Sequence, residues 1–198
     1  MKKLINIAGL VAALVIGLTT PSSSAENSCD GGYSPEMQVK IDEMKKELKN
    51  YTDDKATVEK NLETFDTLDF VVFSNQEWVR LHESHSNDVK VNWPDGHQTN
   101  GIDKHIEDLK AMFVYAPDTK IKVHPIKFGS GEFTCVTGIM TGTFSKPMPI
   151  GDGKFIQPTD KKYSIPMCTV GHWKDGVMIE ESLFWDNATF MKQIGLAQ

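Results

Sequence analysis

Positive charge is scarce in this sequence and forms no cluster. The 198 residues include 21 Lys and Arg against 27 Asp and Glu, which gives a net charge of −6. Proteins that bind nucleic acids or anionic membrane surfaces normally present a basic patch. We therefore expect neither a nucleic acid nor a membrane surface as a partner. The sequence also lacks internal repeats and low-complexity tracts, so a repeat architecture is not expected.

Long apolar runs are also missing, except at the N-terminus. Residues 4–18 are mostly apolar, follow Lys2 and Lys3, and precede small residues at 23–25. This order is typical of a signal peptide, and the run is short for a membrane span. We predict that residues 1–25 are removed and that the protein is exported, to the periplasm or outside the cell. The mature chain would have 198 − 25 = 173 residues and a charge of 19 − 27 = −8, enough for one domain with a core.

Cysteine is limited to three residues. In an oxidising compartment, three cysteines suggest one disulfide and one free thiol. Cys135 and Cys168 lie on strand-like runs at equal distances from the middle of one loop, so they could face each other. Two small buried apolar residues would explain them equally well, and both alternatives stay open. No cysteine has a fixed basic partner, and no serine lies at a glycine-flanked elbow, so neither is expected to be a nucleophile.

Apolar residues recur at helical spacing in the first part of the mature chain, which predicts helices over about 36–50 and 54–69. A third helix is expected from Ser74, where Glu77 completes a capping box. Four residues of that helix would share one face: Trp78, Leu81, His82 and His85. Two histidines on such a stripe either pack in the core or line a cavity. No third ligand is evident in the sequence, so no metal is expected there.

From residue 89 the pattern becomes that of strands. They are expected over 89–93, 97–100, 120–128, 132–144, 163–173 and 177–186. A turn is predicted at Pro94-Asp95-Gly96, a helix over 104–114, and a closing helix from the cap Asn187 to Gly195. Helices followed by a mainly antiparallel sheet indicate an α+β fold. The segment 145–160, rich in Pro and Gly, is expected to be an ordered loop that could cover a pocket mouth.

Short motifs follow one another through the strand region: Pro94-Asp95-Gly96, Gly101-Ile102, Ala116-Pro117-Asp118, Gly142-Thr143-Phe144, Asp175-Gly176, Trp185-Asp186 and Gln193-Ile194-Gly195. Their order and spacing resemble the SnoaL-like polyketide cyclases (ester cyclases) of the nuclear transport factor 2-like superfamily. The resemblance implies a curved antiparallel sheet wrapped around helices, a cone-shaped α+β barrel with an internal apolar pocket, and homodimers through the outer sheet face. It implies a family domain over 53–198, preceded by an extension over 26–52 with an amphipathic helix.

The resemblance also implies a chemistry. In characterised cyclases of this type, an acid late in the fold removes and returns a proton during an intramolecular aldol closure, and a histidine on the neighbouring strand assists. Asp186 is similar to that acid and His172 to that histidine. A carboxylate in an apolar pocket loses hydration, so its pKa should rise towards neutrality, where proton transfer is efficient. Capping the following helix is the rival role for Asp186.

The turn before the last strand decides which side chains face the pocket. A period of two places five residues on one face: Met178, Glu180, Ser182, Phe184 and Asp186. A three-residue turn over 174–176 would place His172 opposite Met178, on that same face. A two-residue Asp175-Gly176 turn would instead place Trp173 opposite Met178. We favour the three-residue turn, which makes Glu180 a second pocket acid and leaves Glu181 facing solvent.

The sequence thus predicts an exported acid/base enzyme that acts without cofactor or metal on a small apolar carbonyl compound, as a cyclase, isomerase or hydrolase. The alternative is a module of the same fold that binds a small molecule or a second copy of itself without catalysis. The candidate catalytic residues are Asp186, His172 and Glu180. The candidate substrate-binding residues are His85, Trp93, His97, Phe184 and Met178. His105 and His124 have no supporting context and are expected to be surface or packing residues.

Overall fold

The computed structural model describes residues 33–198, so the expected signal peptide at 1–25 and Cys29 lie outside the described residues. The chain divides into two units, 1–42 and 43–198, and the second contains every element discussed below except the start of the first helix. Within the described residues, no helix has both the length and the apolar character that crossing a membrane requires.

One long helix, α2 (Pro35–Thr67), replaces the two helices expected over 36–50 and 54–69. The sequence between them contains neither Pro nor Gly, so nothing interrupts the backbone hydrogen bonds there. An ion pair between Lys49 and Asp53, one turn apart, spans the expected break. Near the C-terminal end of α2, three residues are buried: Val58, Asn61 and Phe65.

The third helix expected from Ser74 does not form. The chain continues from α2 as a π-helix, η1 (Leu68–Phe73), and a short 3-10 helix, η2 (Trp78–Glu83), follows. The hydroxyl of Ser74 does not cap a helix because it donates to the Asp69 carbonyl and accepts from the Ile121 amide. His85 already belongs to a strand, so it shares no helix face with His82, which is exposed.

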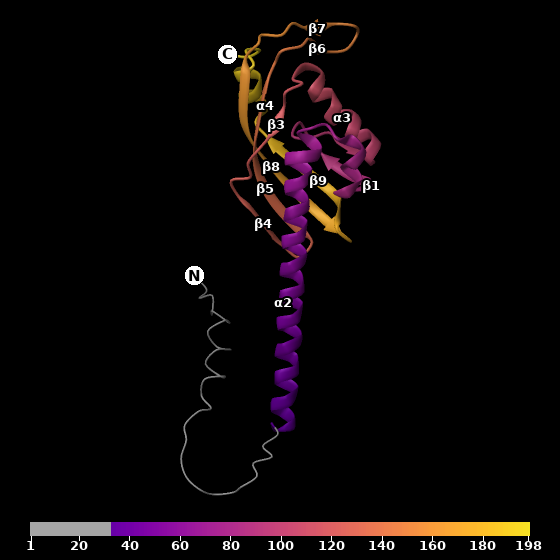
Figure 1. Ribbon diagram of the computed structural model, residues 1–198, viewed down its shortest axis with the longest axis vertical. Helices are drawn as coiled ribbons and strands as arrows, with labels where there is room; N and C mark the ends of the chain where they lie inside the picture. The colour runs from indigo at the N-terminus through magenta and orange to yellow at the C-terminus, as the bar shows by residue number, and fades with distance from the viewer. Residues whose placement is uncertain (1–32) are drawn as a thin grey trace, which may run out of the picture. The chain divides into compact units, whose positions relative to one another are not determined.

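Seven strands form one sheet in the order β2-β1-β9-β8-β5-β3, with β4 also paired to β5. Their bounds are β1 (His85–Asn92), β2 (Gln98–Asn100), β3 (Lys120–Ile121), β4 (Lys127–Ser130), β5 (Phe133–Thr143), β8 (Lys162–Lys174) and β9 (Val177–Trp185). β1 and β9 run parallel, whereas the other pairs are antiparallel. The sheet is curved (Figure 1), and the α+β fold expected from the sequence is confirmed.

One face of the sheet packs against helices and forms the core. Along β5, buried and half-buried residues alternate with a period of two, as expected for a strand with one covered face. Helix α3 (Ile102–Tyr115) packs against β1, and the closing helix α4 (Asn187–Gln193) packs against β8. The core includes Phe65, Leu68, Val91, Leu109, Phe113, Val136, Met140 and Ile165.

The connection between β8 and β9 decides which residues of β9 face this core. Trp173 pairs with Met178 and Lys174 with Val177, so the turn has two residues. Both of them, Asp175 and Gly176, have positive φ angles of 52° and 85°, as a tight hairpin turn of this kind requires. The prediction of a three-residue turn is therefore wrong.

A β-bulge follows directly after this turn. His172 pairs with Glu180 although Trp173 pairs with Met178, so Ile179 is an extra residue in β9. The extra residue reverses the alternation along the strand. Met178 before the bulge and Glu181 and Leu183 after it are buried, whereas Phe184 is exposed. The single face expected to carry Met178, Glu180, Ser182, Phe184 and Asp186 therefore does not exist.

The segment 145–160 folds into a small second sheet made of β6 (Met148–Pro149) and β7 (Phe155–Ile156). Met148 and Ile156 pack against the core, so the segment is ordered as expected. Among the described residues, however, the cavity discussed below has no lining residue from this segment.

Cys135 and Cys168 approach each other on neighbouring strands. Cys135 on β5 pairs with Val170 and Cys168 on β8 pairs with Thr137, so the two cysteines are diagonal neighbours. Their sulfur atoms lie 3.5 Å apart, and both thiols are free. Both side chains are half-buried, which agrees with the proximity suggested by the sequence.

Candidate functional site

An internal cavity of about 40 Å³ is lined by residues of the sheet and the helices. Much of its wall is apolar and includes Leu109, Met112, Met140, Met167 and Leu183. Polar side chains also reach it: Asp69, His85, His105, Thr169 and Glu181. A mostly apolar hollow with a few convergent polar groups is the usual form of a small-molecule site.

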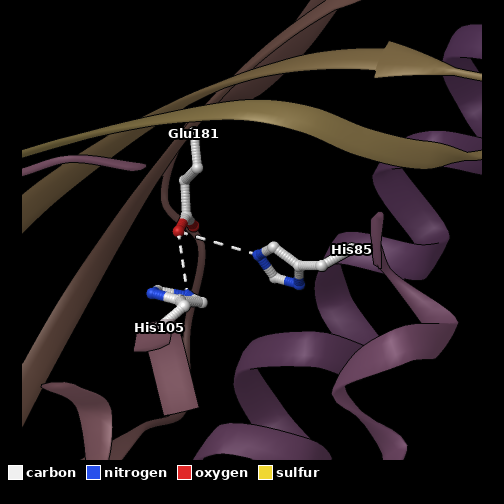
Figure 2. A group of neighbouring side chains, drawn as sticks. All are labelled: His85, His105 and Glu181. Atoms are coloured by element: carbon white, nitrogen blue, oxygen red, sulfur yellow. Dashed lines mark ion pairs between the residues drawn. The ribbon is translucent and has the colours of Figure 1, made fainter. Parts of the chain in front are cut away.

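Three of these polar side chains come together from distant parts of the chain. His85 is the first residue of β1, His105 lies in the first turn of α3, and Glu181 lies on β9 (Figure 2). The bulge at Ile179 turns Glu181 inward. Helix α3 starts after Gly101, whose carbonyl accepts a hydrogen bond from the His105 amide, and this start places His105 beneath the sheet.

One carboxylate oxygen contacts both imidazoles. Oε2 of Glu181 lies 3.2 Å from Nε2 of His105 and 3.6 Å from Nε2 of His85. Figure 2 shows the carboxylate reaching towards both rings, whose centroids are 5.1 Å apart. The exposed side-chain fractions are 6% for Glu181, 2% for His105 and 1% for His85. The cluster is therefore shielded from bulk water.

The electrostatic state of Glu181 follows from this contact. Burial by itself raises the pKa of a carboxyl group, but His105 and His85 outweigh it and hold the pKa of Glu181 well below its usual range. Glu181 is thus a buried anion at neutral pH. A buried anion is tolerated only beside compensating partners, which the two imidazoles provide.

Several atoms of the cluster lack hydrogen-bond partners. In the described part of the chain, these include His85 Nε2, His105 Nδ1 and Glu181 Oε2. Nδ1 of His85 lies 2.9 Å from the Ser84 hydroxyl, which helps to fix that ring. Buried polar atoms without protein partners beside a cavity are normally satisfied by water or a bound molecule. Nδ1 of His105, which makes neither of the contacts with Glu181, is therefore available to a ligand.

The same side chains could also hold a divalent cation. One ligand atom from each of the three residues lies within 4.8 Å of the others. Two imidazoles and one carboxylate are a ligand set used for zinc and non-haem iron. Sequence patterns do not reveal this set, because its members are separated by 20 and 76 positions along the chain.

A second group of ionisable side chains reaches the cavity through Asp69, in the π-helix η1. Nε2 of His124 lies 2.8 Å from Oδ2 of Asp69, and Nδ1 lies 2.8 Å from Oδ1 of Asp66. Burial raises the pKa of Asp69 despite the opposing effect of His124. For His124, burial lowers the pKa, but the two carboxylates outweigh it and the pKa lies above its usual value.

The structure places the three predicted catalytic residues away from the cavity. Asp186 is exposed and caps α4, accepting hydrogen bonds from the amides of Ala188 and Thr189 at 2.9 and 3.1 Å. His172 stacks on Phe133 with a centroid distance of 4.4 Å. The prediction that both side chains point inward is wrong. The two-residue turn puts Trp173 instead of His172 opposite Met178, and the bulge at Ile179 moves Asp186 to the other face of the sheet.

Glu180 also points away from the cavity. Its Oε1 accepts hydrogen bonds from Lys90 Nζ at 3.0 Å and from Asn92 Nδ2 at 2.8 Å. These partners lie on β1, and Glu180 is half-buried. The inward position expected for Glu180 is instead occupied by its neighbour Glu181, which was expected to face solvent.

The predicted substrate-binding residues are only partly brought together. His85 and Trp93 line the cavity. Met178 is fully buried but is not part of the cavity wall, and Phe184 is 54% exposed. His97 is exposed and stacks on Trp93, with ring centroids 5.6 Å apart.

Five residues of these groups were not recognised from the sequence: Asp66, Asp69, His105, His124 and Glu181. A local signal existed for one of them. His105, Leu109 and Phe113 recur every four residues on α3, and all three are buried. Glu181 had no such signal, because the position of a bulge cannot be read from the strand pattern.

Comparisons with known proteins agree with this architecture. A candidate SnoaL-like polyketide cyclase from Jannaschia sp. CCS1 is 20% identical, with a TM-score of 0.62 over 71% of this chain and 95% of that one. IdmH, a candidate polyketide cyclase from Streptomyces antibioticus, is 18% identical, with a TM-score of 0.58 over 68% and 98%. A protein from Catenulispora acidiphila with a ketosteroid isomerase-like fold, solved in complex with trimethylamine, is 9% identical, with a TM-score of 0.54 over 69% and 92%.

These likenesses establish the fold, and no curated protein sequence matches the chain. The family follows from a separate comparison. The model of the SnoaL-like polyketide cyclases matches residues 66–194, which is more than half of the sequence. The chain therefore belongs to the SnoaL-like polyketide cyclase family.

Proposed function

We propose that this protein is an acid/base enzyme of the cyclase, isomerase or hydrolase type that acts without a cofactor on a small, largely apolar carbonyl compound. One observation carries the proposal: a buried, ionised carboxylate contacts two imidazoles on the wall of a mostly apolar cavity. Membership of a family named for cyclases supports the same reaction class.

The cluster suits proton transfer by an imidazole. Glu181 contacts His105 through Nε2, which leaves Nδ1 of His105 without a partner. A carboxylate that orients one ring nitrogen and stabilises the imidazolium is a common means of activating a histidine base. Because the pKa of Glu181 is lowered, Glu181 is better suited to this supporting role than to taking the proton itself. His105 would remove a proton from the carbon next to the carbonyl and return it later.

The cavity wall limits the substrate to a small and mostly apolar molecule. The volume of about 40 Å³ is well below that of typical drug-sized ligand sites. Three flexible methionines in the wall, Met112, Met140 and Met167, can change rotamer to admit a larger molecule. Trp93 and Trp185 also line the cavity and add aromatic surface to its wall.

Hydrogen exchange next to a carbonyl tests the proposal directly. The mature protein is incubated in D₂O with phenylacetone or ethyl acetoacetate, and loss of the α-proton signal is followed by NMR. Glu181→Gln and His105→Asn should each slow the catalysed exchange by about 10²-fold or more. Glu180→Gln is the matched control, because this neighbouring carboxylate binds Lys90 and Asn92 instead of the cluster.

If Glu181→Gln exchanges the α-proton at the wild-type rate, the role assigned to Glu181 is refuted. If the wild-type protein binds a ketone without exchanging its α-proton, a non-catalytic binding module is supported. Exchange that disappears after chelation and returns with Zn²⁺ would refute the cofactor-free mechanism. It would instead assign the His85, His105 and Glu181 atoms to a metal.

We further propose that the mature protein is exported and forms a homodimer through the sheet face opposite the cavity. The exposed aromatic residues Phe128, Phe133 and Phe184 on β4, β5 and β9 support such an interface. N-terminal sequencing of the secreted chain should begin at Glu26. Light scattering should give twice the mass of one chain, and a monomer at micromolar concentration would refute the dimer.

A further inference from the structure

We propose that Asp69 is a second catalytic residue of the cavity, a general acid, and that the His124 imidazolium, held by Asp66, supplies its proton. This inference rests on the proposed acid/base function and adds the proton donor that the function requires. Its basis is a continuous chain of contacts from a partly exposed carboxylate, through a buried imidazole, to a carboxylate on the cavity wall.

The contacts around His124 define its protonation state. Both ring nitrogens face carboxylate oxygens at 2.8 Å, Nδ1 towards Asp66 and Nε2 towards Asp69. A neutral imidazole has a single N–H and could donate to only one of them, whereas the imidazolium donates to both. The raised pKa of His124, in which the carboxylates outweigh burial, agrees with this state. The ring thus holds a proton that it can pass on.

Packing keeps this ring in place. The side chain of His124 is 2% exposed, and the rings of Phe70 and Phe65 lie 4.4 and 5.7 Å from it between centroids. Lys127 binds the second oxygen of Asp66, which favours the ionised form of that carboxyl and lowers its pKa despite partial burial. Asp66 therefore orients the imidazolium and leaves the Nε2 proton directed at Asp69.

Asp69 lies in the π-helix η1. Ser74 donates its amide to the Asp69 carbonyl five residues back, as a π-turn requires. Such turns are rare and occur often at functional sites. Asp66 and Asp69 are three positions apart, so their side chains share one side of the helix and both contact the His124 imidazole. Asp69 is also part of the cavity wall.

The surroundings of Asp69 favour its protonated form. The charged groups around Asp69 are His124, Glu181 and His85. Burial and the negative charge of Glu181 raise the pKa of Asp69, although His124 opposes this. A carboxylate on the cavity wall whose pKa is raised takes a proton from a neighbouring imidazolium more readily and can pass it to a bound carbonyl oxygen.

The protons balance without any further reactant. In the first half, the Asp69 carboxylate takes the Nε2 proton of His124 and passes a proton to the carbonyl oxygen. His105 Nδ1 takes the α-proton, and the C–H electron pair forms the enol double bond. In the second half, the enol oxygen returns its proton through Asp69 to His124, which restores the imidazolium and the carboxylate. The electron pair of the enol double bond forms a new C–C bond to a second carbonyl, whose C=O π bond breaks and whose oxygen takes the proton from His105.

Nitrogen NMR of the histidine rings provides a test that does not depend on turnover. In mature protein labelled with ¹⁵N on histidine, His124 should show two protonated ring nitrogens at pH 7. A neutral His124 with one N–H would overturn the proposal. Asp66→Asn and Asp69→Asn should each lower the pH at which the second proton is lost.

Turnover provides the second test, with the same two ketones in D₂O. Asp69→Asn should slow exchange by about 10²-fold. The wild-type rate should fall above neutral pH, where His124 loses the proton that it supplies. His124→Gln should slow exchange and remove this fall. His124→Gln retains the carboxylate of Asp69 and keeps the test decisive if Asp69→Asn does not fold. Asp54→Asn, an exposed aspartate of the same helix α2, should match the wild type.

The outcomes separate the two proposals. If Glu181→Gln loses exchange but Asp69→Asn and His124→Gln retain the wild-type rate and pH profile, the proposed function stands and this inference is overturned. If the wild-type protein exchanges neither ketone, the proposed function fails and the catalytic role of Asp69 fails with it. A doubly protonated His124 would then be part of a structural ion-pair network only.

Discussion

Trp173 on β8 lies directly opposite Met178 on β9. A three-residue turn would instead have placed His172 opposite Met178. Both side chains are buried in the core. The bulge at Ile179 then shifts the next pair to His172 and Glu180, so that Glu181 is the residue that enters the cavity. The candidate site therefore depends on the local geometry of one hairpin.

The stabilisation that ionised Glu181 gives to the folded state should be lost in acid. Its folded-state pKa lies below the unfolded value, because His105 and His85 outweigh burial. The ionised Glu181 therefore contributes to the free energy of unfolding above the pKa that it has in the unfolded chain, about 4.3. This contribution is lost as the pH falls below that value, towards the folded-state pKa. We expect Glu181→Gln to lower the free energy of unfolding at pH 7 and to flatten its pH dependence below pH 5. Urea titrations from pH 3 to 7 measure this, and a difference that stays constant over that range would contradict it.

His124 should show the opposite dependence on pH. Burial lowers its pKa, but Asp69 and Asp66 raise it further, so the folded-state value exceeds the unfolded one of about 6.5. Its stabilising contribution is complete below that pH and is lost as pH rises through the folded-state pKa. The wild type should lose stability from about pH 6.5 upward, and His124→Gln should remove this loss. Denaturant titrations from pH 6 to 9 test it, and an unchanged slope in the variant would count against the network.

Asp186 should matter for the closing helix rather than for proton transfer. Its side chain caps α4 through the amides of Ala188 and Thr189. Asp186→Ala should lower the melting temperature by about 2–4 °C, whereas Asp186→Asn, which retains a capping oxygen, should change it little. Both variants should exchange the probe ketones at the wild-type rate. A loss of exchange in folded Asp186→Asn would restore the role that the sequence suggested.

The thiol of Cys168 should react slowly near neutral pH. Burial and the neighbouring Cys135 raise the pKa of Cys168 to about 11, and only the thiolate is nucleophilic. Alkylation by iodoacetamide, followed by mass spectrometry of peptides, should therefore accelerate about tenfold for each pH unit between 7 and 10. A free cysteine in the unfolded protein is the reference. Rapid alkylation of folded Cys168 at pH 7 would contradict the raised pKa of its thiol.

Local patterns were sufficient for much of the strand region. The turn at residues 94–96, the paired strands β5 and β8, and the placement of Trp93 in the interior follow from short-range alternation and turn chemistry. Helix boundaries were less predictable, because tertiary contacts decided them. Ser74 could have capped a helix, but its hydroxyl bonds to Asp69 and to Ile121 on β3 instead.

The sequence by itself determined the fold class and the family. Hydrophobic periodicity and the order of short motifs involve residues that are close together in the chain, so they can be read without knowing any long-range contact. Only the tertiary structure decided which ionisable groups meet. Glu181 rather than Glu180 enters the cavity because a single extra residue in β9 reverses the strand's faces. Asp69 and His124, 55 positions apart, become partners because β3, which ends shortly before His124, packs against the π-helix that carries Asp69. Such encounters depend on the packing of whole elements, and no local pattern encodes them.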